Sequence, residues 1–219
     1  NLMTHLDRQR FEVAAISLSD REGWALEQRL MEENLQVWHL GKKAGFDPKI
    51  LIGIRNVVRQ FRPHVVQSHM CLHYVLPSLM RRASASLVDT VHLPGENKSR
   101  RITRWLNQYA FRRGVVPVAV SARTGDWVKD VYGLRQCAVI PNGIPIGDYA
   151  LPATSRQAWR KKHGFKEEDV LFVCAARFDK QKNHTMLLEA FARGPGREAR
   201  THLLLAGEGE LKQDLEAQI

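Results

Sequence analysis

Eight short apolar runs, most of them followed by a stretch with helical spacing, constrain the fold of this chain more than any other feature. The runs lie at residues 11–18, 35–40, 64–69, 87–93, 115–121, 137–142, 170–176 and 201–207. They are apolar almost throughout, as is typical of strands in a sheet that helices cover on both faces. Strands that alternate with helices over such lengths form parallel sheets with right-handed crossovers. The sequence therefore predicts an α/β protein with doubly wound, Rossmann-like parallel sheets.

The clearest helical pattern lies between Asp47 and Pro63. Asp47 can cap this helix, and Pro48 suits its first turn because the N–H that proline lacks would have no partner there. Pro63 then ends the helix. The apolar side chains share one face, at Ile50, Ile54, Val57, Val58 and Phe61. This spacing predicts an amphipathic helix that packs against a sheet.

The alternation breaks over residues 142–168, and this break divides the chain into two domains. Residues 142–155 are rich in Gly, Pro and Asp, as linkers are, and a short helical pattern follows at 155–164. We expect a first domain at residues 1–147, a linker with a short helix at 148–168, and the start of a second domain at 169–219. Both ends of the sequence fall within helical patterns. We therefore expect a fragment that lacks the first strand of its first domain and most of its second domain.

The charge of the chain favours anionic partners. The formal net charge is +10. Residues 1–150 hold 21 Lys and Arg against 13 Asp and Glu, whereas residues 151–219 hold 12 against 10. The surplus therefore belongs to the first domain, and it suits membrane headgroups, phosphorylated substrates or nucleic acid.

Two classes of protein are disfavoured by what the sequence lacks. No apolar run approaches the roughly 20 residues that a membrane-spanning helix needs. Cys71, Cys137 and Cys174 are too few and too widely spaced for a disulfide framework. This cysteine usage predicts a reducing, cytoplasmic location.

Three cations gather on the loop that follows the seventh apolar run, at Arg177, Lys180 and Lys182. Asp179 and Asn183 could form the turn without them. Ligands of open α/β sheets bind at the carboxyl ends of strands. Guanidinium and ammonium groups at that edge suit a diphosphate, whose charge grows as a leaving group departs. We expect Arg177 and Lys182 to bind such an anion and Lys180 to face solvent; the alternative is a solvated basic turn.

Gly207 and Gly209 lie in the next strand-to-helix turn. A dinucleotide-binding fingerprint would need a third glycine at position 212, which is occupied by Lys212. The two glycines therefore predict only that the backbone closely approaches another group at this turn.

Histidines supply the candidates for acid–base chemistry and for metal binding. His92 lies near the end of the fourth apolar run, where a neutral imidazole could accept or orient a proton in a cleft between the domains. The alternative is a hydrogen-bonded surface histidine. His69 and His73 lie four residues apart with Cys71 between them, which suggests zinc ligands. No HExxH glutamate and no second cluster completes a tetrahedral set, so we expect no metal.

Residues 98–113 carry six Lys and Arg and no Asp or Glu. Ile102, Trp105, Leu106 and Tyr109 have helical spacing, which places them on one apolar side. This pattern indicates either a core-packed helix with a solvated basic face or an interfacial helix that draws the protein onto anionic lipid. Nucleic acid is a third alternative, but Trp105 and Tyr109 lie on the apolar side rather than where bases would stack.

Taken together, several segments resemble the retaining glycosyltransferases of family four, also called group 1 glycosyltransferases, which have the two-Rossmann GT-B fold. In the second half of the chain they are "VIPNGI", "LFVCAARFDKQKNHTMLLEAF" and "HLLLAGEGELKQDL". In the first half, "RPHVVQSHM", "VDTVHLPGE" and "VVPVAVSARTGDWV" follow the family's order. The resemblance covers essentially the whole chain.

This resemblance implies an N-terminal acceptor-binding domain and a C-terminal domain that binds a UDP- or GDP-linked sugar. It implies transfer with retention of anomeric configuration, without a bound metal or another cofactor. Arg177 and Lys182 match the pair that holds the donor diphosphate, and His92 matches the histidine that contacts the transferred sugar. Gly207 and Gly209 fall at the donor-side turn.

The expected protein is thus a cytoplasmic glycosyltransferase, peripheral on the inner face of the membrane, that makes an envelope glycan or glycolipid. The family's Gly-rich loop after the first strand and its downstream glutamate motif are missing from these residues, so the fragment by itself is expected to be inactive. One alternative is another GT-B enzyme, such as a sugar-nucleotide epimerase. The other is a non-catalytic basic α/β module that binds anionic lipid or nucleic acid.

Overall fold

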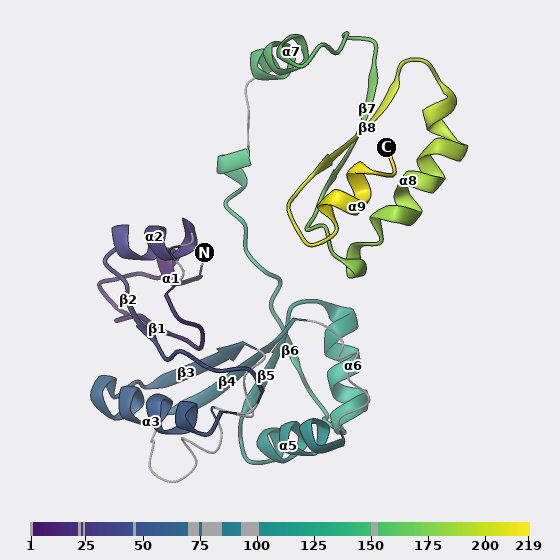
Figure 1. Cartoon of the computed structure of the whole chain (residues 1–219). Coiled ribbons are helices and arrows are strands. Elements are labelled where there is room, and N and C mark those ends of the chain that lie inside the picture. The colour runs from purple at the N-terminus through teal and green to yellow at the C-terminus, as the bar shows by residue number, and fades with distance from the viewer. Residues whose placement is uncertain are drawn as a thin grey trace. The chain divides into compact units, whose positions relative to one another are not determined.

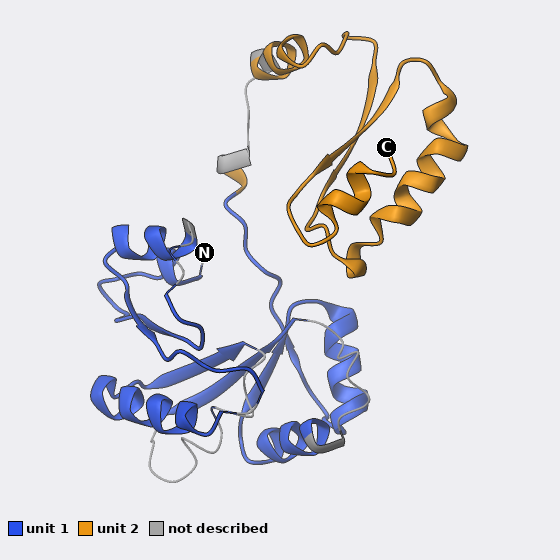
Figure 2. Ribbon diagram, in the orientation of Figure 1, with its two compact units in different colours: residues 1–145 blue, residues 146–219 orange. Residues whose placement is uncertain are grey.

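The computed structural model of the chain consists of two compact units, residues 1–145 and residues 146–219 (Figure 2). It describes residues 2–21, 23, 25–45, 47–69, 75, 85–92, 101–149 and 153–219. In this part of the chain, no helix has the length and apolar character needed to cross a membrane.

Unit 1 contains two parallel sheets (Figure 1). The smaller sheet pairs β1 (Ala14–Ser17) with β2 (Gln36–His39). The larger sheet has the order β3-β4-β5-β6, with strands Val65–His69, Ser86–Val91, Val116–Ala119 and Ala138–Val139. Every pairing is parallel. The six strands expected in this half of the chain and their parallel arrangement are confirmed.

The described helices of unit 1 alternate with its strands, as the sequence predicts. They are α1 (Leu2–His5), α2 (Ala25–Glu32), α3 (Lys49–Phe61), α5 (Arg101–Arg112) and α6 (Ala122–Tyr132). The start of α3 is held by Asp47, whose Oδ1 accepts a hydrogen bond from the Lys49 amide at 3.0 Å. Its end lies at Phe61, because Arg62 adopts a left-handed conformation just before Pro63. The roles expected of Asp47 and Pro63 are therefore confirmed, whereas Pro48 lies at the N-cap and not in the first turn.

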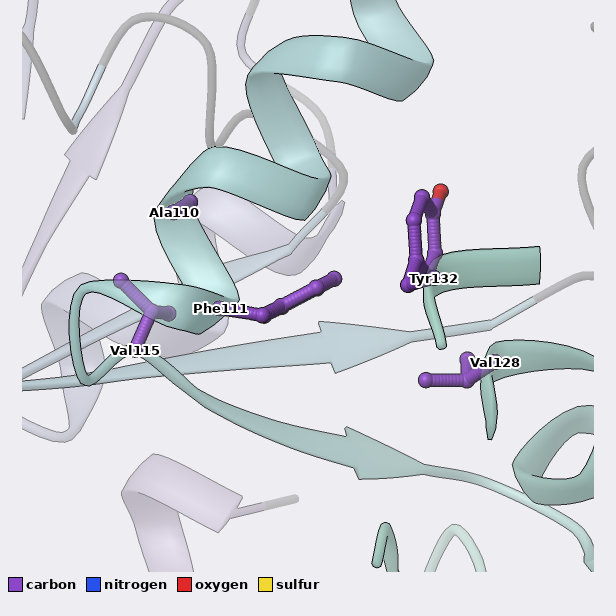
Figure 3. Packing of buried hydrophobic residues seen from close by; sticks show 5 residues of the cluster. All are labelled: Ala110, Phe111, Val115, Val128 and Tyr132. Carbon is purple, nitrogen blue, oxygen red and sulfur yellow. The ribbon is translucent and has the colours of Figure 1, made fainter. Parts of the chain in front are cut away.

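Two apolar clusters form the core of unit 1. One joins α5, α6 and the start of β5 through Ala110, Phe111, Val115, Val128 and Tyr132 (Figure 3). Leu87 and Val91 of β4 pack against this cluster, so α5 and α6 cover one face of the larger sheet. The second cluster is centred on Ile50 and Ile54 of α3, which pack against Ile16, Leu18 and Leu40 near the smaller sheet.

Unit 2 is built around one parallel pair of strands, β7 (Val170–Ala175) and β8 (Thr201–Ala206). Its helices are α7 (Ala153–Lys162), α8 (His184–Arg193) and α9 (Lys212–Glu216). Three short 3-10 helices complete it: η1 (Ile146–Tyr149), η2 (Lys180–Lys182) and η3 (Pro195–Arg197). The strands expected at 170–176 and 201–207 are confirmed, as is the short helix expected after the linker.

Helix α7 is joined to the start of β7 by a buried arginine. The Arg160 side chain donates hydrogen bonds to the carbonyl oxygens of Lys166, Glu167 and Asp169. A guanidinium group can satisfy several carbonyls at once because its five donors have a fixed, planar arrangement. Arg160 therefore fixes the chain between α7 and β7.

The apolar side chains of β7 are less covered than the sequence predicts. Val170, Phe172 and Val173 are 52%, 45% and 64% exposed. Phe172 makes an edge-to-face contact with Phe191 of α8, with 5.9 Å between the ring centroids. The expectation that helices cover both faces of this strand is therefore wrong for the described residues, because a pair of strands with few neighbours leaves part of its apolar surface open.

Candidate functional site

The cationic loop after β7 is organised by Asp179. Its Oδ2 forms an ion pair with Nη2 of Arg177, with 2.8 Å between the two atoms. Its Oδ1 accepts hydrogen bonds from the backbone amides of Gln181 and Lys182, at 3.1 and 3.3 Å. These amides belong to the first turn of η2, so Asp179 serves as an N-cap. One carboxylate thus holds both the side chain of Arg177 and the backbone that carries Lys182.

Both candidate diphosphate ligands are accessible. The Arg177 side chain is 78% exposed, and Lys182 is exposed as well. An exposed ion pair such as Arg177–Asp179 is typically worth only about 0–1 kcal/mol, so an anion can compete for this guanidinium. Lys180 is also exposed, in agreement with the sequence. The convergence of Arg177 and Lys182 on one point stays a prediction.

Two buried residues, one within the loop and one directly after it, have roles that the sequence did not reveal. Phe178 is buried at 6% exposure, and its ring meets that of His184 edge-on, with 5.1 Å between centroids. His184 is the first residue of α8 and is only 1% exposed. Neither of its ring nitrogens has a hydrogen-bond partner among the described residues. The two rings thus form a buried contact that supports the loop. Nothing in the local sequence pattern distinguished His184 from a solvent-exposed residue at the start of a helix.

Gly207 and Gly209 allow the turn after β8 to lie directly against the cationic loop. A β-carbon on Gly207 would overlap the carbonyl oxygen of Ala176, and one on Gly209 would overlap the backbone of Phe178. The Phe178 amide donates to the carbonyl of Glu208 at 2.9 Å, while the Phe178 carbonyl accepts from Leu211 at 3.1 Å. The close approach expected of these glycines is therefore made to the neighbouring loop, and their contact with a donor stays a prediction.

In unit 1, His92 directly follows β4 and is paired with another histidine. Nδ1 of His69 lies 2.9 Å from Nε2 of His92, and the ring centroids are 5.2 Å apart. His69 ends β3, where it is exposed, while His92 is half-buried. The sequence singled out both residues but did not predict that they would meet. The position of His92 relative to unit 2 stays a prediction.

A second polar pair lies earlier on the same strands, where Ser68 is paired with Asp89. The buried hydroxyl of Ser68 donates a short hydrogen bond to Oδ1 of the buried carboxyl of Asp89. Burial raises the pKa of Asp89, while the hydrogen bond from Ser68 and the nearby His92 act in the opposite direction. Alternation along a strand places this pair on the face opposite to His69, toward the helices α5 and α6. Polar groups therefore line both faces of β3 and β4 as these strands end.

Although His69 is exposed, part of its ring is shielded from water, which lowers its pKa, and the charge of His92 lowers this pKa further. His69 is consequently neutral near pH 7, with one ring nitrogen that donates and one that accepts. The surface next to the pair is also polar, because Nε2 of Gln67 donates to the hydroxyl of Thr90 at 2.8 Å. This end of the sheet can thus position a hydroxyl-bearing ligand through uncharged hydrogen-bonding groups.

The zinc alternative falls partly outside the described residues. His73 and Cys71 lie there, so their arrangement with His69 is not described. In the rest of the chain, no three His, Cys, Asp or Glu side chains come together as metal ligands would. Cys137 and Cys174 are free thiols.

Both candidate sites lie at the carboxyl ends of parallel strands, which is where open α/β sheets bind ligands. At this edge, unit 2 presents exposed cations and unit 1 presents a pair of histidines. Residues 1–147 match the family model described as Glycosyltransferase Family 4. The chain belongs to this family. Residues 155–219 match a second model, described as Glycosyl transferases group 1.

Solved structures of glycosyltransferases share the fold. A glycosyltransferase from Rickettsia africae superposes with a TM-score of 0.66 at 14% identity, over 93% of this chain and 54% of its own. HepE from Anabaena, solved in complex with UDP and glucose, superposes with a TM-score of 0.69 at 15% identity, over 94% of this chain and 65% of its own. No curated protein sequence matches the chain significantly. The fold is thus of the GT-B type, and the chain spans between half and two thirds of these structures.

Proposed function

We propose that the protein transfers a sugar from a nucleotide-diphosphate sugar to an envelope glycan or a lipid-linked acceptor, with retention of configuration. The observation that carries this proposal is the exposed cationic loop after β7, whose Arg177 and Lys182 are both held by Asp179. It lies within the segment that matches the group 1 model. The complex of HepE with UDP and glucose supports a UDP-linked donor, and a GDP-linked donor is the alternative.

Each candidate residue has a defined task in this reaction. The bond between the sugar and the diphosphate breaks first, and negative charge grows on the departing phosphate. Arg177 can bind two phosphate oxygens through its planar fork, while Lys182 supplies a flexible point charge. Together they balance the charge without a metal ion. His92 contacts the transferred sugar. The acceptor hydroxyl attacks from the face that the diphosphate leaves, and its proton passes to the departing phosphate oxygen.

The two alternatives fit less well. Membership of a glycosyltransferase family favours transfer over the epimerase chemistry of another GT-B enzyme. A non-catalytic basic module would not need Asp179 to hold Arg177 in place, since solvated cations bind lipid or nucleic acid without a fixed geometry.

Donor kinetics in the full-length protein test the proposal. A hydrogen bond to a charged group is worth about 1.5–3 kcal/mol, so Arg177→Ala or Lys182→Ala should lower kcat/KM for the donor about ten- to a hundredfold. Part of the loss should appear in kcat, because the charge is greatest as the diphosphate leaves. Lys180→Ala, on the same turn, is the matched control. Equal kinetics for all three variants and the wild type would leave only a solvated basic turn.

A peripheral location on the cytoplasmic face of the membrane is the second part of the proposal. Helix α5 presents Trp105 at 61% exposure, stacked on Tyr109 with 5.7 Å between ring centroids. The Arg113 guanidinium lies over the Tyr109 ring at 5.1 Å from its centroid, and Arg112 is exposed nearby in sequence. Tyr109 packs against the core cluster, whereas Trp105 is exposed, so α5 shows features of both the core-packed and the interfacial alternatives. An exposed tryptophan among cations suits an anionic lipid interface.

Sedimentation with vesicles tests this location. Binding should require anionic lipid and weaken as salt is added, because each cation near such a surface contributes up to about 1 kcal/mol. Trp105→Ala should weaken it further, whereas Ile52→Ala, which removes a side chain of similar exposure (63%) from α3, should not. Equal binding to neutral vesicles would contradict the electrostatic account.

A further inference from the structure

The pairing of His69 with His92 depends on the register of β3 and β4. In this register His69 lies opposite Thr90, so His92 is two positions further along the neighbouring strand. Residues offset by two positions share a face of the sheet, and diagonal neighbours lie within reach of long side chains. The two imidazoles therefore meet where the strands end, with 2.9 Å between Nδ1 of His69 and Nε2 of His92.

This contact restricts the protonation of both rings. A neutral imidazole has one N–H donor and one acceptor nitrogen, so one ring must donate at the junction and the other must accept. The tautomer of His92 is consequently tied to that of His69. Because Nε2 of His92 is engaged by His69, Nδ1 is the nitrogen that remains for a ligand. Among the described residues, no group bonds to this Nδ1.

We propose that His69 is a positioning residue, which fixes the ring orientation and the tautomer of His92 so that Nδ1 of His92 is presented to the bound sugar. The part that concerns the sugar rests on the proposed function, in which His92 contacts the transferred group. The pairing of the two rings stands on the geometry alone. In this arrangement His69 touches no reacting atom and acts only through His92.

A matched pair of substitutions separates the hydrogen bond from the shape of the side chain. His69→Asn keeps a polar atom on Cγ, where Nδ1 of the histidine is attached. His69→Leu has nearly the same branched shape but no polar atom. His64→Leu, at the start of the same strand region, controls for the loss of an exposed histidine. Thermal melts of the full-length variants show that each remains folded.

The first measurement is the nitrogen-15 spectrum of the histidine rings, which does not require activity. The wild type and His69→Asn should show His92 in one fixed tautomer, with clearly different shifts for its two nitrogens. His69→Leu should bring these shifts closer together, as two tautomers exchange. An unchanged His92 spectrum in His69→Leu, or the same change in both variants, would overturn the proposal.

The second measurement is donor kinetics. A neutral hydrogen bond corresponds to about a three- to tenfold change, so His69→Leu should lower kcat by that factor with little change in KM. His69→Asn should restore most of the loss. If His92→Ala leaves transfer unchanged, the proposed role of His92 in the reaction is wrong, whereas the ring spectra still decide whether His69 orients it.

Discussion

The cationic loop of unit 2 and the histidine pair of unit 1 occupy equivalent places, at the carboxyl ends of parallel strands, but they are built in different ways. Within the loop, Asp179 contacts residues no more than three positions away, and backbone hydrogen bonds join the loop to the turn after β8. The pair joins side chains that are 23 positions apart in the sequence. The backbone contacts of the loop should therefore remain when one of its charged side chains is replaced. The contact between His69 and His92 is lost when either ring is replaced.

The carboxylates at the two sites, Asp179 and Asp89, also differ in how far they are exposed to solvent. Asp179 is partly exposed, and its charge is used by Arg177 and by two backbone amides. Asp89 is buried, and burial raises its pKa against the effect of the Ser68 hydroxyl. A partly exposed carboxylate thus shapes the phosphate-binding candidate, while a buried one lies between the strands that carry the histidines. Three predictions test this contrast, in order of decreasing effect.

The largest effect is expected at Gly207, where the two turns of unit 2 touch. A β-carbon there would overlap the Ala176 carbonyl, which cannot move freely because the Ala176 amide is bonded to Ala206 at 3.0 Å. Overpacking of this kind costs about 1–3 kcal/mol, so Gly207→Ala should lower the free energy of unfolding in urea by that amount. Gly147→Ala, which would meet nothing within 4 Å, is the control and should change it by less than about 0.5 kcal/mol.

The effect of Gly207→Ala should be confined to unit 2 and should leave the histidine pair of unit 1 unchanged. Amide hydrogen exchange should speed up in β7 and β8, while the His92 ring spectrum stays unchanged because that ring belongs to unit 1. A loss of protection spread equally over both units would contradict the local account.

A smaller effect on stability is expected at Asp179. Two substitutions there distinguish the contribution of the N-cap from that of the ion pair with Arg177. Asp179→Ala removes both and should lower the free energy of unfolding by about 0.5–2 kcal/mol, as the loss of an N-cap does. Asp179→Asn keeps an oxygen that can accept from Gln181 and Lys182, so it should lose only the exposed pair with Arg177, worth less than about 1 kcal/mol. Urea unfolding measures both. If both variants lost the same free energy of unfolding, the charge of Asp179 and not its N-cap hydrogen bonds would stabilise the loop.

The smallest effect is a pH dependence from Asp89. Its pKa is raised in the folded protein, so the unfolded chain releases this proton at a lower pH than the folded chain does. Asp89 therefore contributes most to stability below its unfolded pKa, and this contribution falls as the pH rises through the window up to its folded pKa. Relative to Asp89→Asn, the wild type should lose stability across that window and then level off.

Ser68→Ala sharpens the test of Asp89. The Ser68 hydroxyl lowers the pKa of Asp89 from the value that burial alone would produce, so its removal should extend the window to higher pH. Unfolding free energies at a series of acidic pH values measure both variants. Parallel curves for the wild type and Asp89→Asn would contradict the prediction, because they would mean that Asp89 has the same pKa in the folded and unfolded chain.

Much of the fold was predictable because its signals are local. All eight strands and helix α3 follow from runs of apolar residues and from turn-forming residues such as Asp47 and Pro63. The cationic loop was predictable for the same reason, since its charges and its cap lie within a few residues of one another. The exposure of Trp105 and of β7 was not, because burial depends on which neighbours reach a surface.

The sequence by itself determined the order of the strands and helices, the α/β class and the identity of the groups that can bind an anion. Only the tertiary structure decided which of those groups meet. The register of β3 and β4 brings His69 to His92, and the packing of two turns explains why Gly207 carries no side chain. Such contacts depend on distances between segments far apart in the chain, and a one-residue shift in register would place His69 on the opposite face from His92.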